Sequence, residues 1–304
     1  MRVSGTARGL GRLAADALLL TTAIVWGVTF VVQKDIGDLP PLAFVAARFA
    51  VSALAVAPLA LLEGWRVASP ARKGARRLAV VIGVMLFLGA SLQQAGLATA
   101  SATNGGFLTA CYVVLTPFVV WALSRTPPRA VVLAAGGASL LGAWLLGTGG
   151  GPAEPPTIGD GLVLVADLAW ATQIALTPVF LVRTERPLAL ALSQYAISAA
   201  LAAVSSAAFE SAEPAAFLSA GPAILFAGLV SGGLGYTLQI VGQRRTPPAE
   251  AALILSLESV FAAVAGAVFL HERLTATAAA GCALILLGAV VAETAPVLAG
   301  RKPA

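Results

Sequence analysis

Long apolar stretches alternate with short polar connections along the whole chain. Because a helix needs about 20 apolar residues to cross the hydrocarbon core of a bilayer, each stretch is long enough for one transmembrane helix. The pattern predicts ten such helices, five in each half, over residues 15–33, 40–62, 77–98, 102–123, 130–148, 159–182, 188–209, 222–242, 249–270 and 275–293. The predicted fold class is therefore an all-α polytopic membrane protein.

Composition agrees with a chain that lies in lipid. Hydrophobic residues make up 59% of the 304 residues and charged residues 11%, whereas soluble domains contain about half and about a quarter. Ten spans with their connections use almost the whole length, so no soluble domain of useful size is expected. The two cysteines, Cys111 and Cys282, fall in apolar segments, which predicts neither a disulfide framework nor a metal site. No cofactor is expected.

The two halves of the chain repeat one another. Asp16 and Trp26 in the first predicted helix recur as Asp160 and Trp170 in the sixth, at a shift of 144 residues. The start of the second predicted helix likewise matches the start of the seventh, at a shift of 146 residues. A membrane chain built from two copies of one unit is typical of a carrier.

The repeat predicts two five-helix units, residues 1–150 and 151–304. Because each unit has an odd number of spans, the second must be inserted upside down relative to the first, about a pseudo-two-fold axis in the membrane plane. Two such units can exchange conformations. That exchange converts an inward-open cavity into an outward-open one, which is alternating access.

Basic residues predict how the chain lies in the membrane. With the N-terminus placed inside, 16 of the 19 Lys and Arg residues fall in connections on that side, while Lys34 and Arg273 fall outside and Arg48 is intramembrane. Since basic residues are retained in the cytoplasm, both termini are expected there, with the chain multi-pass in a bacterial-type inner (plasma) membrane. The net charge of +5 is then a topology signal. Membrane lipids are expected partners and nucleic acid is not.

Motifs near both ends of the chain carry a family resemblance. The first is Val-Trp-Gly-Val-Thr-Phe at 25–30, followed by Pro40 and by Ala-Ala-Arg-Phe at 46–49. The second is Leu-Glu-Ser-Val-Phe at 257–261, followed by Gly-Cys-Ala-Leu-Ile-Leu-Leu-Gly at 281–288. In order and spacing, these motifs resemble the opening and closing units of an EamA-type member of the drug/metabolite transporter superfamily. The resemblance covers nearly the whole chain.

The resemblance implies a ten-helix carrier of small metabolites. Helices one, three, four, six, eight and nine would surround the cavity, and helices five and ten would be peripheral. The sequence agrees, because the fifth predicted helix has no charged or amide side chain. Helices five and ten can then face lipid in a monomer or a second copy in a homodimer. Ser259 stands where the family usually has proline, so helix nine is expected to be straighter than is typical.

Polar and aromatic side chains within the predicted helices mark a candidate cavity. Because an unpaired polar group in hydrocarbon is costly, such groups normally face the interior of a helix bundle. The candidate cavity residues are Trp26, Gln93, Gln94, Asn104, Tyr112, Trp170, Tyr236 and Gln239. Trp26 and Trp170 are repeat-equivalent, so they either face the cavity from opposite sides or pack where helices one and six meet.

Three charged residues, Arg48, Asp167 and Glu258, lie deep in the predicted helices. Glu258 is either a proton or substrate site or a structural carboxylate, and Asp167 has the same two interpretations. Arg48 is expected to be mainly structural, either through an ion pair with one of the carboxylates or by snorkelling between helices. An ion pair that breaks between conformations would be functional as well.

These observations favour a secondary carrier, not an enzyme. It would export small metabolites, amino acids or related compounds, either as a facilitator or coupled to protons through Glu258 or Asp167. A membrane-embedded lipid-processing enzyme would need a nucleophile and base, or a metal set, and the single histidine, His271, does not supply one. A channel would need a ring of like charge or a filter-like loop. With Arg48 as the one intramembrane cation, multiply anionic cargo is disfavoured.

Overall fold

The described part of the chain is helical throughout its regular structure. The computed structural model describes residues 5–33, 36–66, 74–97, 108–149, 151, 155, 157–269 and 273–298, and of residues 5–10, 30–33, 65–66, 293 and 295–298 it gives the helix alone. The helices are α1 (Gly5–Gln33), α2 (Pro41–Arg66), α3 (Ala75–Leu97), α5 (Tyr112–Ser124), α6 (Ala130–Thr148), α7 (Ile158–Thr184), α8 (Pro187–Phe209), α9 (Pro214–Ser219), α10 (Gly221–Phe226), the π-helix η1 (Ala227–Tyr236), α11 (Thr237–Gly242), α12 (Pro248–Leu255), α13 (Glu258–Phe269) and α14 (Ala276–Leu298). His271 lies outside the described residues.

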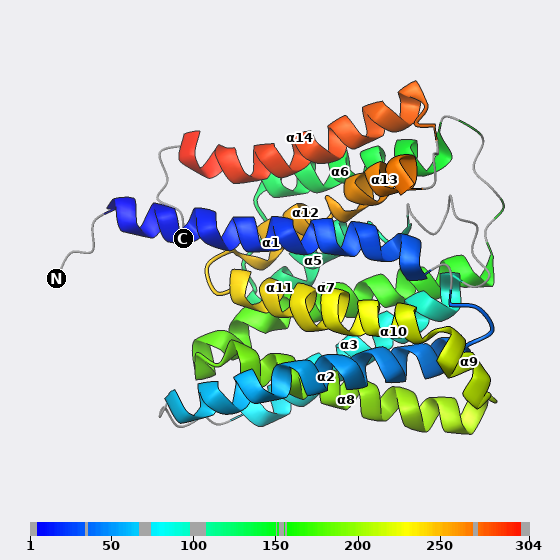
Figure 1. Cartoon of the computed structure of the whole chain (residues 1–304). Coiled ribbons are helices and arrows are strands. Elements are labelled where there is room, and N and C mark those ends of the chain that lie inside the picture. Colours follow the sequence, from blue (N-terminus) through cyan, green and yellow to red (C-terminus); the bar gives the residue numbers. More distant parts are fainter. Residues whose placement is uncertain are drawn as a thin grey trace.

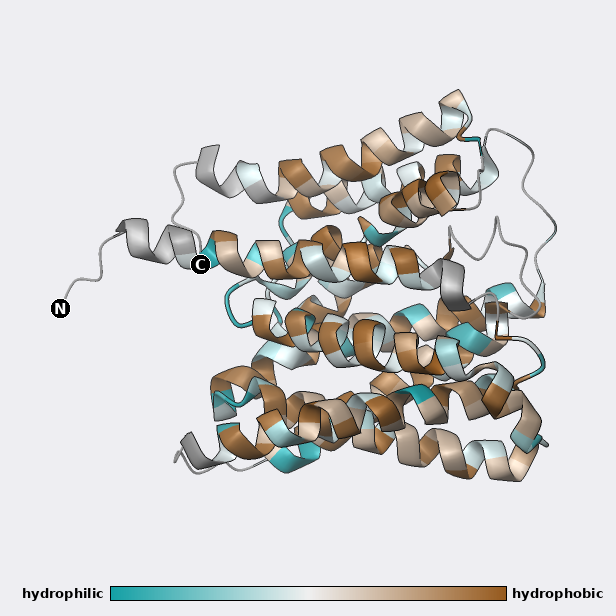
Figure 2. Ribbon diagram, viewed as in Figure 1, coloured by the Kyte–Doolittle hydropathy of each residue, from teal (hydrophilic) through white to brown (hydrophobic). Residues whose placement is uncertain are grey.

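The helices confirm the predicted fold class. Eight helical segments among the described residues are long and apolar enough to cross a membrane, and two further apolar helices, Tyr112–Ser124 and Ala276–Ala292, are shorter. The long helices lie side by side in one bundle (Figure 1). Apolar residues dominate them, and polar residues are frequent at their ends and in the connections (Figure 2).

The two halves of the bundle are inverted. In Figure 1, α1 and α7, which begin the two halves, run in opposite directions, and α14 ends at the same end of the bundle at which α1 begins. Reciprocal contacts between α2 and α8 follow the same symmetry. In each case a glutamate near the end of one helix accepts hydrogen bonds from two backbone amides at the start of the other. The bonds run from Leu42 and Ala43 to Glu210, and from Leu188 and Ala189 to Glu63, at 2.8 to 3.0 Å.

The ninth membrane segment is broken near its middle. The helix stops at Leu255 and restarts at Glu258, with Ser256 and Leu257 in a turn. The Ser256 hydroxyl donates to the carbonyl of Leu253 at 2.8 Å, a local bond that competes with regular helix formation. The expectation that Ser259 straightens this helix is therefore wrong, because the interruption does not require a proline at 259.

In the fourth membrane segment, the described helix begins at the position equivalent to the start of α13. Residues Thr109 to Cys111 form turns, and α5 starts at Tyr112, which is 146 residues before Glu258. Discontinuous helices of this kind place helix ends inside the membrane. In other carriers such ends lie at the binding site near the midplane.

Charged residues gather at the end of the bundle where α1 begins. Arg12 pairs with Asp16 at 3.2 Å and with Glu250, on α12, at 2.5 Å. Arg129, just before α6, lies 3.7 Å from the same Glu250 carboxylate, and Thr246 donates to Asp16 at 2.6 Å. The connections expected on one side of the membrane therefore meet at one end of the molecule.

Candidate functional site

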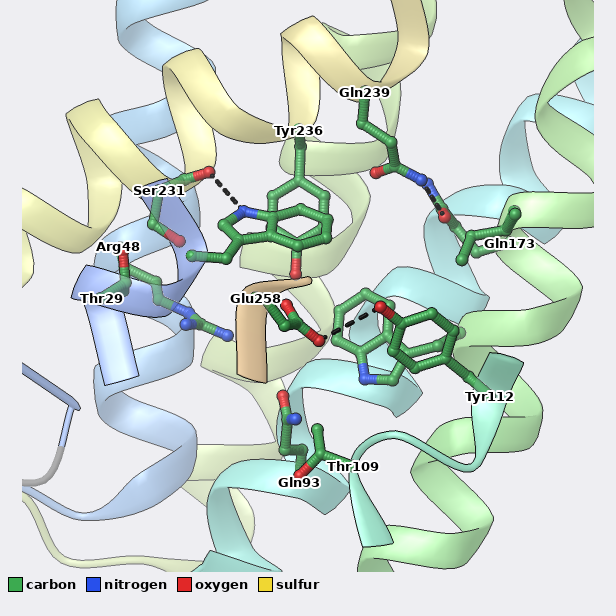
Figure 3. Close-up of a pocket in the computed structure, with 13 residues that line it drawn as sticks. Thr29, Arg48, Gln93, Thr109, Tyr112, Gln173, Ser231, Tyr236, Gln239 and Glu258 are labelled. Atoms are coloured by element: carbon green, nitrogen blue, oxygen red, sulfur yellow. Dashed lines mark hydrogen bonds between the residues drawn. The ribbon is translucent and has the colours of Figure 1, made fainter. Parts of the chain in front are cut away.

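A cavity lies among the helices of both halves (Figure 3). It is lined by Trp26, Thr29, Arg48, Gln93, Thr109, Tyr112, Trp170, Gln173, Ile174, Ser231, Tyr236, Gln239 and Glu258. These residues come from membrane segments one, two, three, four, six, eight and nine. Segment two is an addition to the expected set, through Arg48. No lining residue comes from α6 or α14.

The cavity lies on the axis that relates the two halves. Eight of its lining residues form four pairs of repeat-equivalent positions, at shifts of 144 or 146. The pairs are Trp26 with Trp170, Thr29 with Gln173, Gln93 with Gln239, and Tyr112 with Glu258. Members of the last pair touch, because the Tyr112 hydroxyl donates to Glu258 Oε1 at 3.2 Å. Equivalent residues that touch lie close to the axis that relates their halves, so this hydrogen bond marks the neighbourhood of the axis.

Tyr236 connects the two tryptophans. Its ring centroid lies 4.6 Å from that of Trp26, tilted by 54°, and 5.7 Å from that of Trp170, stacked at 18°. The close approach depends on two repeat-equivalent glycines. A Cβ at Gly235 would lie 2.8 Å from Trp26 Nε1, and one at Gly89 would lie 2.8 Å from the Trp170 ring. Both tryptophans thus line the cavity and pack on a shared partner, instead of packing on one another.

Arg48 supplies a buried positive charge to the cavity. The residue is 5% exposed, and its guanidinium lies over the rings of Phe49 and Phe44, at 4.9 and 5.5 Å from their centroids. In Figure 3 the guanidinium points toward Glu258. No ion pair joins it to a carboxylate of the described residues, and its Nε has no hydrogen-bond partner among them. The expected ion pair is not formed in this structure.

Each of the two buried carboxylates lies beside the start of a helix, Glu258 at α13 and Asp167 next to α5. Glu258 lines the cavity and is the first residue of α13. Asp167 is fully buried behind the lining, and the backbone amides of Cys111 and Tyr112, where α5 begins, face its carboxylate. Neither Asp167 oxygen has a partner of good hydrogen-bond geometry within the described residues. The positive end of a helix dipole favours a negative charge at both places.

The π-helix η1 holds Tyr236 and Ser231 in the lining. Its wide turns leave carbonyl groups open to other donors, and side chains from three neighbouring helices bond to them. The four bonds run from Thr22 to Gly235 at 3.1 Å, from Trp26 to Ser231 at 3.2 Å, from Ser52 to Gly228 at 2.8 Å, and from Tyr195 to Gly232 at 2.9 Å. The glycines of this segment therefore allow neighbouring helices to pack closely, and they lie within a distorted helix.

Most of the predicted cavity residues lie together, and the exceptions have simple causes. Gln94 is buried but absent from the lining, because a step of one residue along a helix turns the side chain by about 100° away from Gln93. Asn104 lies outside the described residues. Asp167 sits behind the lining. Sequence reasoning did not single out Thr29, Thr109, Gln173, Ile174 and Ser231 as lining residues, although Thr29 follows Trp26 by one helical turn and is equivalent to Gln173.

The free space in the cavity is small. Its volume of about 50 Å³ holds about three to five water molecules at roughly 10–15 Å³ each. A metabolite is larger than that. Side chains or helices around the cavity must therefore move before a metabolite can bind there.

Comparisons with known proteins agree with this architecture. The model of the EamA-like transporter family matches residues 13–148 and again residues 157–294. An uncharacterized transporter of Archaeoglobus fulgidus is 31% identical over 301 residues, which cover 96% of this chain and 89% of that protein. A crystal structure of another protein shares the fold, with a TM-score of 0.77 and 19% identity over 92% of this chain and 96% of the other. The chain is thus a membrane transporter that belongs to the EamA-like transporter family.

Proposed function

We propose that this transporter is a secondary carrier that exports small metabolites by alternating access of its two inverted halves. The observation that carries the proposal is the position of the cavity. It lies on the pseudo-two-fold axis and is lined by equivalent residues from both halves. A site at this place keeps its ligand contacts while the halves exchange conformations around it, so it can open to either side in turn.

Amino acids and related zwitterions are the substrate class that the cavity chemistry favours. Arg48 offers a guanidinium that has no carboxylate partner among the described residues, and Glu258 offers a carboxylate. A carboxylate of the substrate fits the first group and an ammonium fits the second. The rings of Trp26, Trp170 and Tyr236 give the apolar part of the substrate flat surfaces to contact. Among the described lining residues Arg48 is the one cation, which disfavours multiply anionic cargo.

Glu258 is the proposed site of proton coupling. It lies in the cavity with a hydroxyl partner, Tyr112, at 3.2 Å, and with no cation partner among the described residues. A carboxylate in such a place can take up a proton from whichever side the cavity faces. Asp167, behind the lining, is assigned the structural role of stabilising the start of α5.

The proposed orientation in the membrane rests on the charge distribution. At the end where α1 begins, Arg12 and Arg129 share one acidic partner, Glu250. Since basic residues are retained in the cytoplasm, we place this end inside, with the chain in a bacterial-type plasma membrane.

Counterflow in proteoliposomes tests the carrier function. Vesicles holding purified protein are loaded with one unlabelled amino acid at a time, and uptake of the same radiolabelled compound is followed. A carrier accumulates label transiently above equilibrium, whereas a channel does not. Arg48→Met should reduce this uptake at least tenfold and Arg48→Lys should retain part of it. Absence of counterflow with every amino acid, together with turnover of a lipid, would overturn the proposal in favour of a membrane enzyme.

A further inference from the structure

Four buried glutamines form a chain of amide hydrogen bonds that begins at the cavity. Gln173 and Gln239 line the cavity, and the other two lie behind them. Each of the four is at most 2% exposed. The bonds run from Gln239 Nε2 to Gln173 Oε1 at 3.0 Å, from Gln173 Nε2 to Gln194 Oε1 at 3.2 Å, from Gln239 Nε2 to Gln243 Oε1 at 3.2 Å, and from Gln243 Nε2 to the carbonyl of Ile174 at 2.9 Å.

A backbone carbonyl fixes the direction of this chain. The carbonyl of Ile174 can only accept, so the Gln243 atom that meets it must be the NH₂ group. The oxygen of Gln243 then faces Gln239, and the Gln239 atom that meets that oxygen must also be NH₂. The same NH₂ group donates to Gln173. Both of its hydrogens are therefore used within the protein, and the orientation of the amide is determined.

The consequence is one unused acceptor at the cavity. Gln239 Oε1 is buried and has no hydrogen-bond partner among the described residues. In Figure 3 the amide nitrogen of Gln239 points to Gln173, and its oxygen points to the other side, where Tyr236 lies. A buried acceptor without a partner is costly, and the cost is recovered when a ligand supplies an N–H or O–H group.

The equivalent place in the first half is built differently. Gln93 occupies the position equivalent to Gln239, but Thr29 stands where Gln173 stands in the second half, and Leu97 where Gln243 stands. The Thr29 hydroxyl donates to the carbonyl of Val25 in its own helix, at 2.7 Å. Gln93 therefore lacks the set of partners that orients Gln239, although the two residues share backbone positions.

We infer that Gln239 Oε1 is a specificity-determining acceptor that selects substrates carrying a hydrogen-bond donor on the side chain. The inference rests on the proposed carrier function. It specifies which chemical group the cavity recognises at the end of the substrate that lies opposite the carboxylate. In the view of Figure 3, Arg48 lies on one side of Tyr236 and the Gln239–Gln173 pair on the other. A substrate with its carboxylate at Arg48 places its other end at the amides. The favoured class is neutral amino acids with a hydroxyl, amide or other donor at that end.

Matched pairs of amino acids that differ in this one donor test the inference. The pairs are homoserine with norvaline, glutamine with its methyl ketone 5-oxonorleucine, and tyrosine with 4-fluorophenylalanine. Each compound competes with the radiolabelled substrate in counterflow by the wild-type protein. For at least one pair, the donor member should compete about ten- to a hundredfold more strongly, because a partner-less buried acceptor penalises the donor-free isostere.

Two variants assign the preference to a residue. Gln239→Met should reduce the ratio between pair members to near one, while counterflow of the donor-free member continues. Gln94→Met, the control at a buried glutamine outside the lining, should leave the ratio unchanged. If all three pairs compete equally in the wild type while exchange proceeds, or if the ratio persists in Gln239→Met, the inference is wrong and the carrier function stands. If no amino acid is exchanged at all, the carrier function fails first and the inference fails with it.

Discussion

Tyr112 and Glu258 are single residues whose positions define the centre of the molecule. They occupy equivalent positions in the two halves and share a hydrogen bond of 3.2 Å. One half thus contributes a neutral donor and the other a titratable acceptor. The same asymmetry recurs at Arg48, whose equivalent is Gln194. A symmetric scaffold therefore surrounds a site with distinct chemical ends, as a substrate with two different ends requires.

Substitutions of the two buried carboxylates should distinguish a residue that couples transport to protons from a residue that only stabilises the fold. Glu258→Gln keeps the shape and a hydrogen-bond acceptor for Tyr112 but cannot exchange a proton, so transport driven by a pH gradient should be lost while counterflow persists. Asp167→Asn removes a charge from the start of α5 and should lower both activities together. Both are measured in proteoliposomes with and without an imposed gradient. Equal loss of both activities in Glu258→Gln would assign Glu258 a structural role instead.

The sequence identified most of the lining residues because polar groups in an apolar helix stand out. Trp26, Trp170 and Glu258 are conspicuous for that reason. Thr29 and Ser231 are not, since small hydroxyl residues satisfy themselves on their own helix and occur throughout membrane segments. The amide chain of Gln173, Gln194, Gln239 and Gln243 was beyond sequence reasoning. Its bonds join residues up to 69 positions apart, and only the packing of α7, α8 and α11 brings them together.

At the scale of elements, η1 is the part of the chain that departs most from a regular helix. Its carbonyls take hydrogen bonds from α1, α2 and α8. In the first half, Phe49 stands at the position equivalent to Tyr195 and has no hydroxyl to donate. The corresponding stretch of α3 is a regular α-helix. The bond from Tyr195 to η1 therefore has no counterpart in the first half, whereas the other three donors, Thr22, Trp26 and Ser52, come from α1 and α2.

Removal of one of these donors should destabilise the protein. Tyr195→Phe leaves the ring in place but deprives the Gly232 carbonyl of its partner, which should lower stability by about 1 kcal/mol. The apparent melting temperature of purified protein in detergent measures this change. Thr21→Val is the control, because its hydroxyl bonds only to Ala17 in its own helix and is exposed; it should melt as the wild type does. Identical melting of Tyr195→Phe would contradict the role given to this bond.

The close packing of Gly235, in η1, against Trp26 leads to a further prediction. In Gly235→Ala the added Cβ would lie 2.8 Å from Trp26 Nε1, too close for van der Waals contact, so Trp26 or η1 must move. Counterflow and melting temperature should both fall. Gly137 in α6 has nothing within 4 Å of its Cβ position, and Gly137→Ala should be neutral or slightly stabilising. Full activity of Gly235→Ala would show that Trp26 is not held in place by this contact.

The limits of most helices could be predicted, and the interruptions could not. Hydropathy and proline positions locate spans because lipid demands about 20 apolar residues in each. An interruption within a span leaves hydropathy unchanged. At the break at Ser256 and Leu257 the serine bonds back to Leu253, and serine alone does not distinguish a break from a regular turn.

At the scale of the whole molecule, the inverted repeat unites these features. A tryptophan in the cavity and a glutamate that caps the partner helix of the α2–α8 pair each occur twice, once in each half. The ionic contacts of Arg12, Asp16 and Glu250 lie at one end. The position equivalent to Glu250 is Asn104, which cannot form an ion pair. The sequence of the first half therefore does not provide for the ionic contacts that Glu250 makes in the second half.

Access to a single cysteine in the cavity tests alternating access most directly. Ser231 lines the cavity and is 4% exposed, so Ser231→Cys in a background of Cys111→Ala and Cys282→Ala places a small thiol there. A membrane-impermeant maleimide is applied to oriented vesicles from one side or the other, with and without substrate. Alternating access predicts labelling from each side and a change in both labelling rates when substrate is added. Labelling from one side only, under every condition, would contradict it.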